Sequence, residues 1–489
     1  MAHPTYNGFE TVIGLEVHAQ LSTNSKLFSS SPSGTGSAPN RNINPVCTAQ
    51  PGALPVLNRV AVDFAIRAGI ATNCRINELS IFSRKNYFYP DLPKGYQISQ
   101  YDKPIAEFGH LEIEFENEPG KVETKKIGIT RIHMEEDAGK SQHMSGFSLV
   151  DLNRAGTPLI EIVSEPDFRS PQEAGAYLRK LRAILQYIEV CDGNMQNGNF
   201  RCDANVSVRP IGTAKFGTRA ELKNLNSFRF VEKAIEYEIH RQIGVINGGG
   251  KIVQETRLYD SAKNITQSMR SKEDAHDYRY FPEPDLPPLV LNPAWIQAVK
   301  DALPELPSAK ADRFVKDFGL PEYDAKVITS TKPLAHFYEK AVATSSGEPK
   351  LVSNWLMTEV LRMLKESEKE IEECPFPAEH LGQLVSLIKS GEISSKIAKT
   401  IFEDMWASGK NPKDIMKEKG LVQVSDPNLI ENAVRKIMEA NPKNVTEYRA
   451  GKEKLFGFFV GQVMKETKGM GNPSLVNDIV LAFLKGEKS

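Results

Sequence analysis

Residues 133–140, His-Met-Glu-Glu-Asp-Ala-Gly-Lys, hold the densest group of chemically active side chains in this 489-residue sequence. Three carboxylates, Glu135, Glu136 and Asp137, stand next to one another, and like charges this close repel. A chain retains such a group either on a solvated turn or around a cation. The segment alone leaves both interpretations open.

Acids and bases also recur at alternate positions of three predicted strands, at residues 12–21, 202–208 and 219–223. Alternation places the apolar residues of each strand on one face and the polar residues on the other. A solvated sheet face would show the same pattern as a polar site. The polar positions of interest are Glu16, His18, Asp203, Asn205, Glu221 and Lys223.

Phosphoryl transfer is a reaction that needs such a set of side chains, because the protein mainly positions charged groups and metal ions. Mg²⁺ prefers carboxylate oxygens, and Lys or Arg side chains bind phosphate oxygens. Histidine is an unusual magnesium ligand. His18 therefore indicates Mn²⁺ as an alternative, or a histidine that holds a coordinated water.

The elements that must position these residues follow from length and composition. The length predicts about three domains. We expect a strand-rich α+β domain over 1–293, closed by the proline-rich segment 281–288, then a helical domain over 294–410 and a helical tail over 411–489. No apolar run is long enough to span a bilayer, and five scattered cysteines indicate reduced thiols in a cytoplasmic protein.

Nine segments occur in the order found in one known family. They are Gly14–His18, Arg84–Asp91, Lys94–Gln100, His133–Lys140, Asp151–Leu159, Arg201–Asn205, Glu221–Ser227, Tyr278–Asp285 and Phe458–Lys465. On these segments the chain resembles the B subunits of the aspartyl/glutamyl-tRNA(Asn/Gln) amidotransferases, the GatB family, over essentially its full length.

The resemblance implies an α+β fold: a cradle-shaped catalytic domain of the glutamine synthetase/guanido kinase-like fold, an all-α helical domain and a small all-α tail domain. It also implies an ATP-dependent carbon–nitrogen ligase with glutamine as the nitrogen donor. The side-chain carboxylate of Glu-tRNA(Gln), Asp-tRNA(Asn) or both is phosphorylated, and ammonia then displaces the phosphate. The sequence does not decide between the two tRNAs.

The resemblance assigns roles to individual residues. The metal and catalytic set, for Mg²⁺ beside ATP, is Glu16, His18, Glu135, Glu136, Asp203 and Glu221. Contacts to ATP are assigned to Asn205, Lys223 and Arg279, with structural hydrogen bonds as the alternative. Lys85, Tyr87, Asp91 and Lys94 fall where the family has a polar ammonia channel, with an exposed loop as the alternative.

The chain has no nucleophile motif for glutamine hydrolysis. Ammonia is therefore expected from a partner, which the resemblance identifies as the glutaminase A subunit of a heterotrimer that includes a C subunit. Many relatives carry two cysteine pairs near the N-terminus. Here the corresponding positions are Ser29, Ser31, Asn44 and Cys47, and because one thiol does not make a structural zinc site, we predict no zinc.

The tail, residues 411–489, carries 13 lysines and arginines against 10 acids, a net charge of +3. Several phosphate contacts from such a segment would suffice to bind tRNA. Two other interpretations are a stand-alone ligase of the glutamine synthetase type and a tRNA-binding scaffold with an inactive site. The helical tail disfavours the first, and the complete acidic set disfavours the second.

Overall fold

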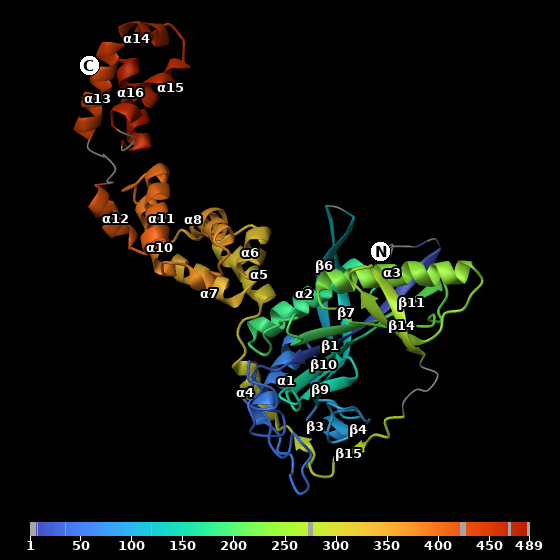
Figure 1. The fold of residues 1–489 in the computed structure, drawn as a ribbon. Coiled ribbons are helices and arrows are strands. Elements are labelled where there is room, and N and C mark those ends of the chain that lie inside the picture. Colours follow the sequence, from blue (N-terminus) through green and yellow to red (C-terminus); the bar gives the residue numbers. More distant parts are fainter. Residues whose placement is uncertain are drawn as a thin grey trace. The chain divides into compact units, whose positions relative to one another are not determined.

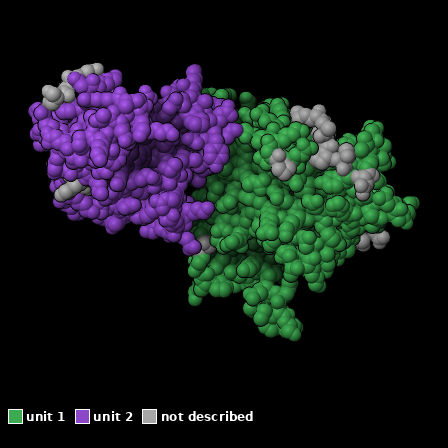
Figure 2. All heavy atoms as spheres, turned by 90° about the horizontal axis from the view of Figure 1, so that it is seen from above, with its two compact units in different colours: residues 1–306 green, residues 307–489 purple. Residues whose placement is uncertain are grey.

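The computed structural model describes residue 6 and residues 8–34, 36–118, 120–271, 277–420, 427–467 and 471–486. The chain forms two compact units, residues 1–306 and 307–489, which are coloured separately in Figure 2. None of the helices in the described residues is long and apolar enough to cross a membrane. The division into three domains stays a prediction.

A 12-stranded sheet is the centre of the first unit, and its main path runs β14-β13-β12-β11-β1-β10-β7-β5-β4-β15. The strands are β1 (Phe9–Gln20), β2 (Arg75–Ile76), β4 (Ser83–Asn86), β5 (Tyr96–Ser99), β6 (Ala106–Glu118), β7 (Lys121–Glu136), β10 (Pro158–Ser164), β11 (Phe200–Pro210), β12 (Ala220–Lys223), β13 (Glu255–Asp260), β14 (Ile265–Ser271) and β15 (Phe281–Pro282). The three strands predicted from alternation are thus β1, β11 and β12.

The two faces of this sheet differ in polarity. The apolar positions of β1, β11, β10 and β7 are buried in one hydrophobic core with helices α1 (Arg59–Ala71), α2 (Pro171–Tyr187) and α3 (Phe228–Asn247). Figure 1 shows α2 and α3 side by side against the sheet, and each contacts a strand of it. The opposite face carries the acids and bases, because successive side chains of a strand alternate between faces.

Local sequence explains how α2 begins. The Ser170 side chain accepts a hydrogen bond from the Glu173 backbone N–H, Pro171 occupies the first turn, and the Glu173 carboxylate accepts from the Arg169 backbone N–H. Such caps satisfy donors that the first helical turn leaves without partners. Leu178, Leu181 and the other apolar residues of one helix face are buried, so α2 packs on the sheet through that face.

The first unit extends past the proline-rich segment. Helix α4 (Pro293–Asp301) belongs to it, and Trp295 Nε1 donates to Asp63 Oδ1 of α1 at 2.6 Å. Two short two-stranded sheets complete the unit: β3 (Leu79–Ser80) pairs with β16 (Leu289–Val290), and β8 (Lys140–Met144) with β9 (Phe147–Asp151).

The second unit is helical throughout its described residues and has two hydrophobic cores. The first core includes α5 (Pro307–Phe318), α6 (Glu322–Ile328), α7 (Lys332–Ala343), α8 (Pro349–Trp355), a π-helical turn (Leu356–Val360), α9 (Leu361–Glu366), a 3₁₀ turn (Ile371–Glu373), α10 (Ala378–Lys389), α11 (Ser395–Ser408) and α12 (Pro412–Lys419). The second is formed around α13 (Pro427–Ala440), α14 (Pro442–Arg449), α15 (Leu455–Glu466) and α16 (Pro473–Lys485). The chain is therefore a mixed α/β protein with a large sheet and a helical C-terminal part.

Candidate active site

The polar face of the large sheet lines a cavity of about 850 Å³. Its walls come from nearly every strand of the main path, from β13 on one side to β4 on the other. Acids occupy the middle, three cationic side chains lie toward β11–β13, and tyrosines lie toward β4. The lining residues used below are Glu16, His18, Lys85, Tyr87, Glu135, Asp137, Arg154, Glu161, Arg201, Asp203, Arg219, Glu221, Lys223 and Tyr278.

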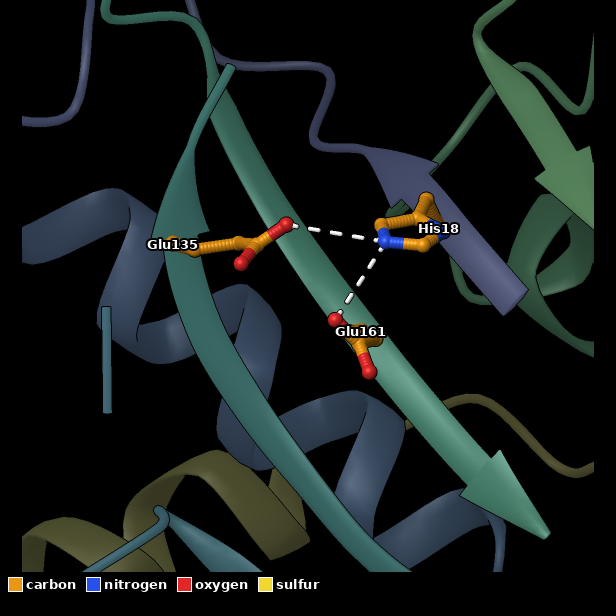
Figure 3. A group of neighbouring side chains, drawn as sticks. All are labelled: His18, Glu135 and Glu161. Atoms are coloured by element: carbon orange, nitrogen blue, oxygen red, sulfur yellow. Dashed lines mark ion pairs between the residues drawn. The ribbon is translucent and has the colours of Figure 1, made fainter. Parts of the chain in front are cut away.

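Three side chains at the middle of the cavity converge on one point, as Figure 3 shows. His18 Nε2 lies 3.3 Å from Glu161 Oε2 and 3.7 Å from Glu135 Oε1. The three potential ligand atoms lie within 4.8 Å of one another. We call His18, Glu135 and Glu161 the acid–histidine cluster.

Sheet register explains why this cluster forms. His18 of β1 pairs with Glu161 of β10, and β10 in turn pairs with β7, which carries Glu135. Because paired residues share a face of the sheet, three strands deliver one side chain each to the same place.

A second histidine completes the surroundings of the two carboxylates. His133 Nε2 lies 3.4 Å from Glu161 Oε2 and 3.8 Å from Glu135 Oε2. Burial alone would lower the pKa of His133, but Glu161 and Glu135 outweigh it and raise that pKa to about 9. Conversely, although burial disfavours their charge, the two histidines hold the pKa of Glu161 well below its usual value and lower that of Glu135.

Further acids lie beside the cluster on β1, β11 and β12. Glu16 pairs in register with Asp203, and burial, followed by the charges of Glu161 and Asp203, raises the pKa of Glu16. Lys223 Nζ contacts the Asp203 carboxylate and lies 3.3 Å from Glu221 Oε1. Asn205 Nδ2 donates to Glu16 Oε1 at 2.9 Å.

The donor set of the acid–histidine cluster fits a divalent cation. Two largely buried carboxylates offer hard oxygen ligands of the kind that Mg²⁺ prefers, and one imidazole nitrogen is equally compatible with Mn²⁺. His133 contacts the same carboxylates and would orient them from behind. His18, Glu135 and Glu161 would hold the ion.

The structure brings together most, but not all, of the residues predicted from the sequence. Glu16, His18, Glu135, Asp203, Glu221 and Lys223 line the cavity, and Asn205 reaches it through Glu16. Glu136 does not line it. Glu136 follows Glu135 on β7, so its side chain turns away from the cluster and pairs with Lys94 instead. Arg279 is exposed and lies outside the lining.

Several lining residues were not predicted. Glu161 is the most important of them. The sequence pattern that could have indicated it is a single acid inside the otherwise apolar strand β10, Pro-Leu-Ile-Glu-Ile-Val-Ser. Asp137 also lines the cavity, but its buried carboxylate is paired with two arginines and not placed beside the other acids. Arg201 Nη2 lies 3.2 Å and Arg154 Nε 3.5 Å from its oxygens. The two arginines thereby present partly neutralised guanidinium groups to the cavity.

The residues predicted for an ammonia channel divide into two places. Lys85 and Tyr87 line the cavity. Lys94 pairs with the buried carboxylate of Glu136, and the Asp91 carbonyl accepts a hydrogen bond from the Gly139 N–H at 2.9 Å. Neither Lys94 nor Asp91 lines the cavity, but both lie against the 136–139 segment.

Ser29, Ser31 and Asn44, which stand where many relatives have cysteines, lie around Cys47. Its Sγ lies 3.5 Å from Ser29 Oγ, and its N–H donates to Asn44 Oδ1 at 3.1 Å. Lys26, which is fully buried, places its Nζ 3.4 Å from the same sulfur. A cationic side chain at this place is unsuited to a metal ion. The absence of zinc stays a prediction.

Comparison with known proteins gives one consistent result. Residues 11–297 match the family model of the GatB/GatE catalytic domain, and residues 336–484 match that of the GatB domain. The B subunits of aspartyl/glutamyl-tRNA(Asn/Gln) amidotransferases from several bacteria are similar along nearly the whole chain. That of Geotalea uraniireducens is 58% identical over 483 residues, covering 98% of this chain and 100% of its own. That of Thermodesulfovibrio yellowstonii is 55% identical over 478 residues, covering 98% and 99%.

Proposed function

The chain belongs to the family of aspartyl/glutamyl-tRNA(Asn/Gln) amidotransferase B subunits, the GatB family, and from this premise we propose how its cavity performs the reaction. The B subunit is part of a glutamine-dependent, ATP-using ligase that amidates mischarged tRNA. We assign the activation of the side-chain carboxylate to the cavity on the polar face of the sheet.

The observation that carries this assignment is the acid–histidine cluster, set between cationic side chains in the matched catalytic domain. A carboxylate is a poor electrophile toward ammonia, and transfer of the γ-phosphoryl group of ATP to one of its oxygens supplies a leaving group. A divalent cation, Mg²⁺ or alternatively Mn²⁺, would reduce the repulsion between this anionic nucleophile and the phosphate.

The chain's own residues supply binding and orientation. Arg201, Arg219 and Lys223 lie on the β11–β12 side, where their charges suit the oxygens of a triphosphate. Asp203 and Glu221 hold Lys223 in place. Asp137 does the same for Arg201. Ammonia attacks the carbonyl carbon of the acyl phosphate, inorganic phosphate leaves with the former carboxylate oxygen, and one ammonia proton is released.

The remaining roles are inferred from the family. Lys85 and Tyr87 would meet incoming ammonia in the cavity, with Lys94, Asp91 and Glu136 beside its route. A glutaminase A subunit would supply that ammonia, a C subunit would complete the heterotrimer, and the tail would bind tRNA. We also propose a cytoplasmic location and a relationship of the sheet domain to the glutamine synthetase/guanido kinase-like fold.

The test is ATP hydrolysis and amidation with Glu-tRNA(Gln) and Asp-tRNA(Asn), measured on the complex reconstituted with A and C subunits. We expect Glu135→Gln, Glu161→Gln and Asp203→Ala each to lower tRNA-dependent hydrolysis by on the order of 100-fold. Glu112→Gln, at an exposed position of β6 in the same sheet, is the matched control and should retain activity. Normal hydrolysis and amidation in the cluster variants would refute the assignment.

A further inference from the structure

Four tyrosines form a row that leads from the cavity to the protein surface. Tyr87 and Tyr278 line the cavity, and their ring centroids lie 6.2 Å apart. Tyr278 and Tyr280 are 6.1 Å apart, and Tyr280 stacks on Tyr101 at 4.0 Å with an interplanar angle of 4°. Tyr101 is 51% exposed. We call these four residues the tyrosine row.

The row is assembled from three neighbouring strands at one edge of the sheet. Tyr87 follows β4, Tyr101 follows β5, and Tyr278 and Tyr280 precede β15. The Asn86 side chain donates to the carbonyls of Tyr278 at 3.1 Å and Arg279 at 2.8 Å, which fixes this segment beside β4. The position of the rings is thus set by the sheet.

Charge distinguishes this edge from the opposite side of the cavity. Arg201, Arg219 and Lys223 lie toward β11–β12, where the proposed function places the triphosphate. At the tyrosine edge, Lys85 is the neighbouring cation, with its Nζ 5.0 Å from the Tyr278 centroid. ATP and the aminoacyl group must both reach the acid–histidine cluster. The tyrosine edge, where ammonia would also arrive beside Lys85 and Tyr87, is therefore the side left for the aminoacyl-tRNA.

Flat aromatic rings are the usual means by which proteins bind single-stranded RNA, because every base has a face on which to stack. The amino acid of an aminoacyl-tRNA is attached to the terminal nucleoside, so bases must lie immediately outside any cavity that holds the amino acid. The tyrosine row begins in the cavity and ends at the surface, which is the path these bases would take.

We propose that the tyrosine row binds the single-stranded 3′ end of the aminoacyl-tRNA by base stacking and thereby directs the aminoacyl group toward the acid–histidine cluster. The proposal rests on the proposed function, since it concerns the same cavity. The adenine of ATP offers the same stacking chemistry from a second source, and the test separates the two.

The experiment uses the reconstituted complex and tRNA(Gln) and tRNA(Asn) transcripts that carry the fluorescent base 2-aminopurine at one of the last three positions, so that the bases beside Tyr280 and beside Tyr101 are each probed. Stacking on a tyrosine changes the emission of this base. We expect Tyr101→Ala and Tyr280→Ala to lose that change upon binding, whereas Tyr101→Phe and Tyr280→Phe retain it. Tyr323→Ala removes an exposed tyrosine from α6 of the second unit and should behave as the unmodified protein.

Kinetics on the same variants supply the second readout. When one tyrosine ring of the row is removed, the KM for aminoacyl-tRNA should rise roughly 5- to 150-fold while kcat and the KM for ATP stay within about twofold. A rise in the KM for ATP alone would instead assign the row to adenine of ATP. Unchanged emission and KM in the alanine variants would refute base binding. The fluorescence readout needs no amidation, so failure of the proposed function is seen separately.

Discussion

At the scale of single residues, the site depends on buried groups that compensate one another's charge. Glu135 and Glu161 are largely buried, and each has a carboxylate oxygen within 4 Å of Nε2 of both His18 and His133. An isolated buried carboxylate would take up a proton. Contact with the two histidines keeps both carboxylates ionised. A bound cation would take the place of the proton on His18 Nε2, because histidine is a metal ligand only when that nitrogen carries no proton.

Cys47 illustrates the same principle away from the cavity. Burial raises the pKa of a thiol, but the Ser29 hydroxyl and the Lys26 ammonium act in the opposite direction and lower the pKa of Cys47 overall. Burial raises the pKa of Cys74 and Cys374 to about 11 and that of Cys191 to about 12. Only the thiolate is strongly nucleophilic.

We therefore predict that Cys47 is alkylated before the other four cysteines as pH is raised toward the ordinary thiol pKa of about 8.5. Iodoacetamide labelling at a series of pH values, mapped by mass spectrometry, measures this. Lys26→Met removes the ammonium and should move Cys47 labelling to higher pH. Earlier labelling of Cys74 or Cys374, both more exposed, would contradict the assignment.

At the scale of elements, strand geometry separates the adjacent acids of the 133–140 segment. Glu135 and Glu136 are consecutive residues of β7 and therefore project from opposite faces. Glu135 joins the acid–histidine cluster, whereas Glu136 pairs with Lys94, whose side chain is 9% exposed. Their functions should separate in the same way.

We predict opposite effects for two variants of the isolated chain: one should lose metal binding and keep its stability, and the other should lose stability and keep metal binding. Glu135→Gln should abolish the binding of Mn²⁺, which is measured by electron paramagnetic resonance. Glu136→Gln should leave that binding intact but lower the melting temperature of the sheet unit, because breaking a buried ion pair costs about 3–5 kcal/mol. Equal loss of Mn²⁺ binding in both variants would show that the two acids share one site.

Alternation was sufficient to predict β1, β11 and β12 and the face that Glu16, Asp203 and Glu221 share. It did not locate Glu161, because the partner of a strand depends on pairing between segments that are far apart in sequence. His18 and Glu161 are brought together only by the register of β1 with β10. The tyrosine row is hidden for the same reason, because β15 lies beside β4 in the sheet although the two strands are far apart in sequence.

At the scale of the whole molecule, the cavity and the tail belong to different compact units. Residues 427–486 include a hydrophobic core of their own, around Val434, Phe459 and Val480. The +3 charge counted over residues 411–489 includes α12, which packs in the other helical core. In the proposed function this basic segment binds tRNA and the sheet unit carries the chemistry. The complete complex is therefore the object on which the central claim must be tested.

That claim is that the side-chain carboxylate of a tRNA-bound amino acid is phosphorylated before it is amidated. The most direct measurement uses Glu-tRNA(Gln) or Asp-tRNA(Asn) whose carboxylate carries isotopically heavy oxygen, with ATP, glutamine and the reconstituted complex. Mass spectrometry of the released inorganic phosphate then measures how much heavy oxygen has passed from the carboxylate to the phosphate. We predict that one heavy oxygen appears in the phosphate for each amide formed. Amide formation with phosphate that contains oxygen only from ATP and water would contradict the account.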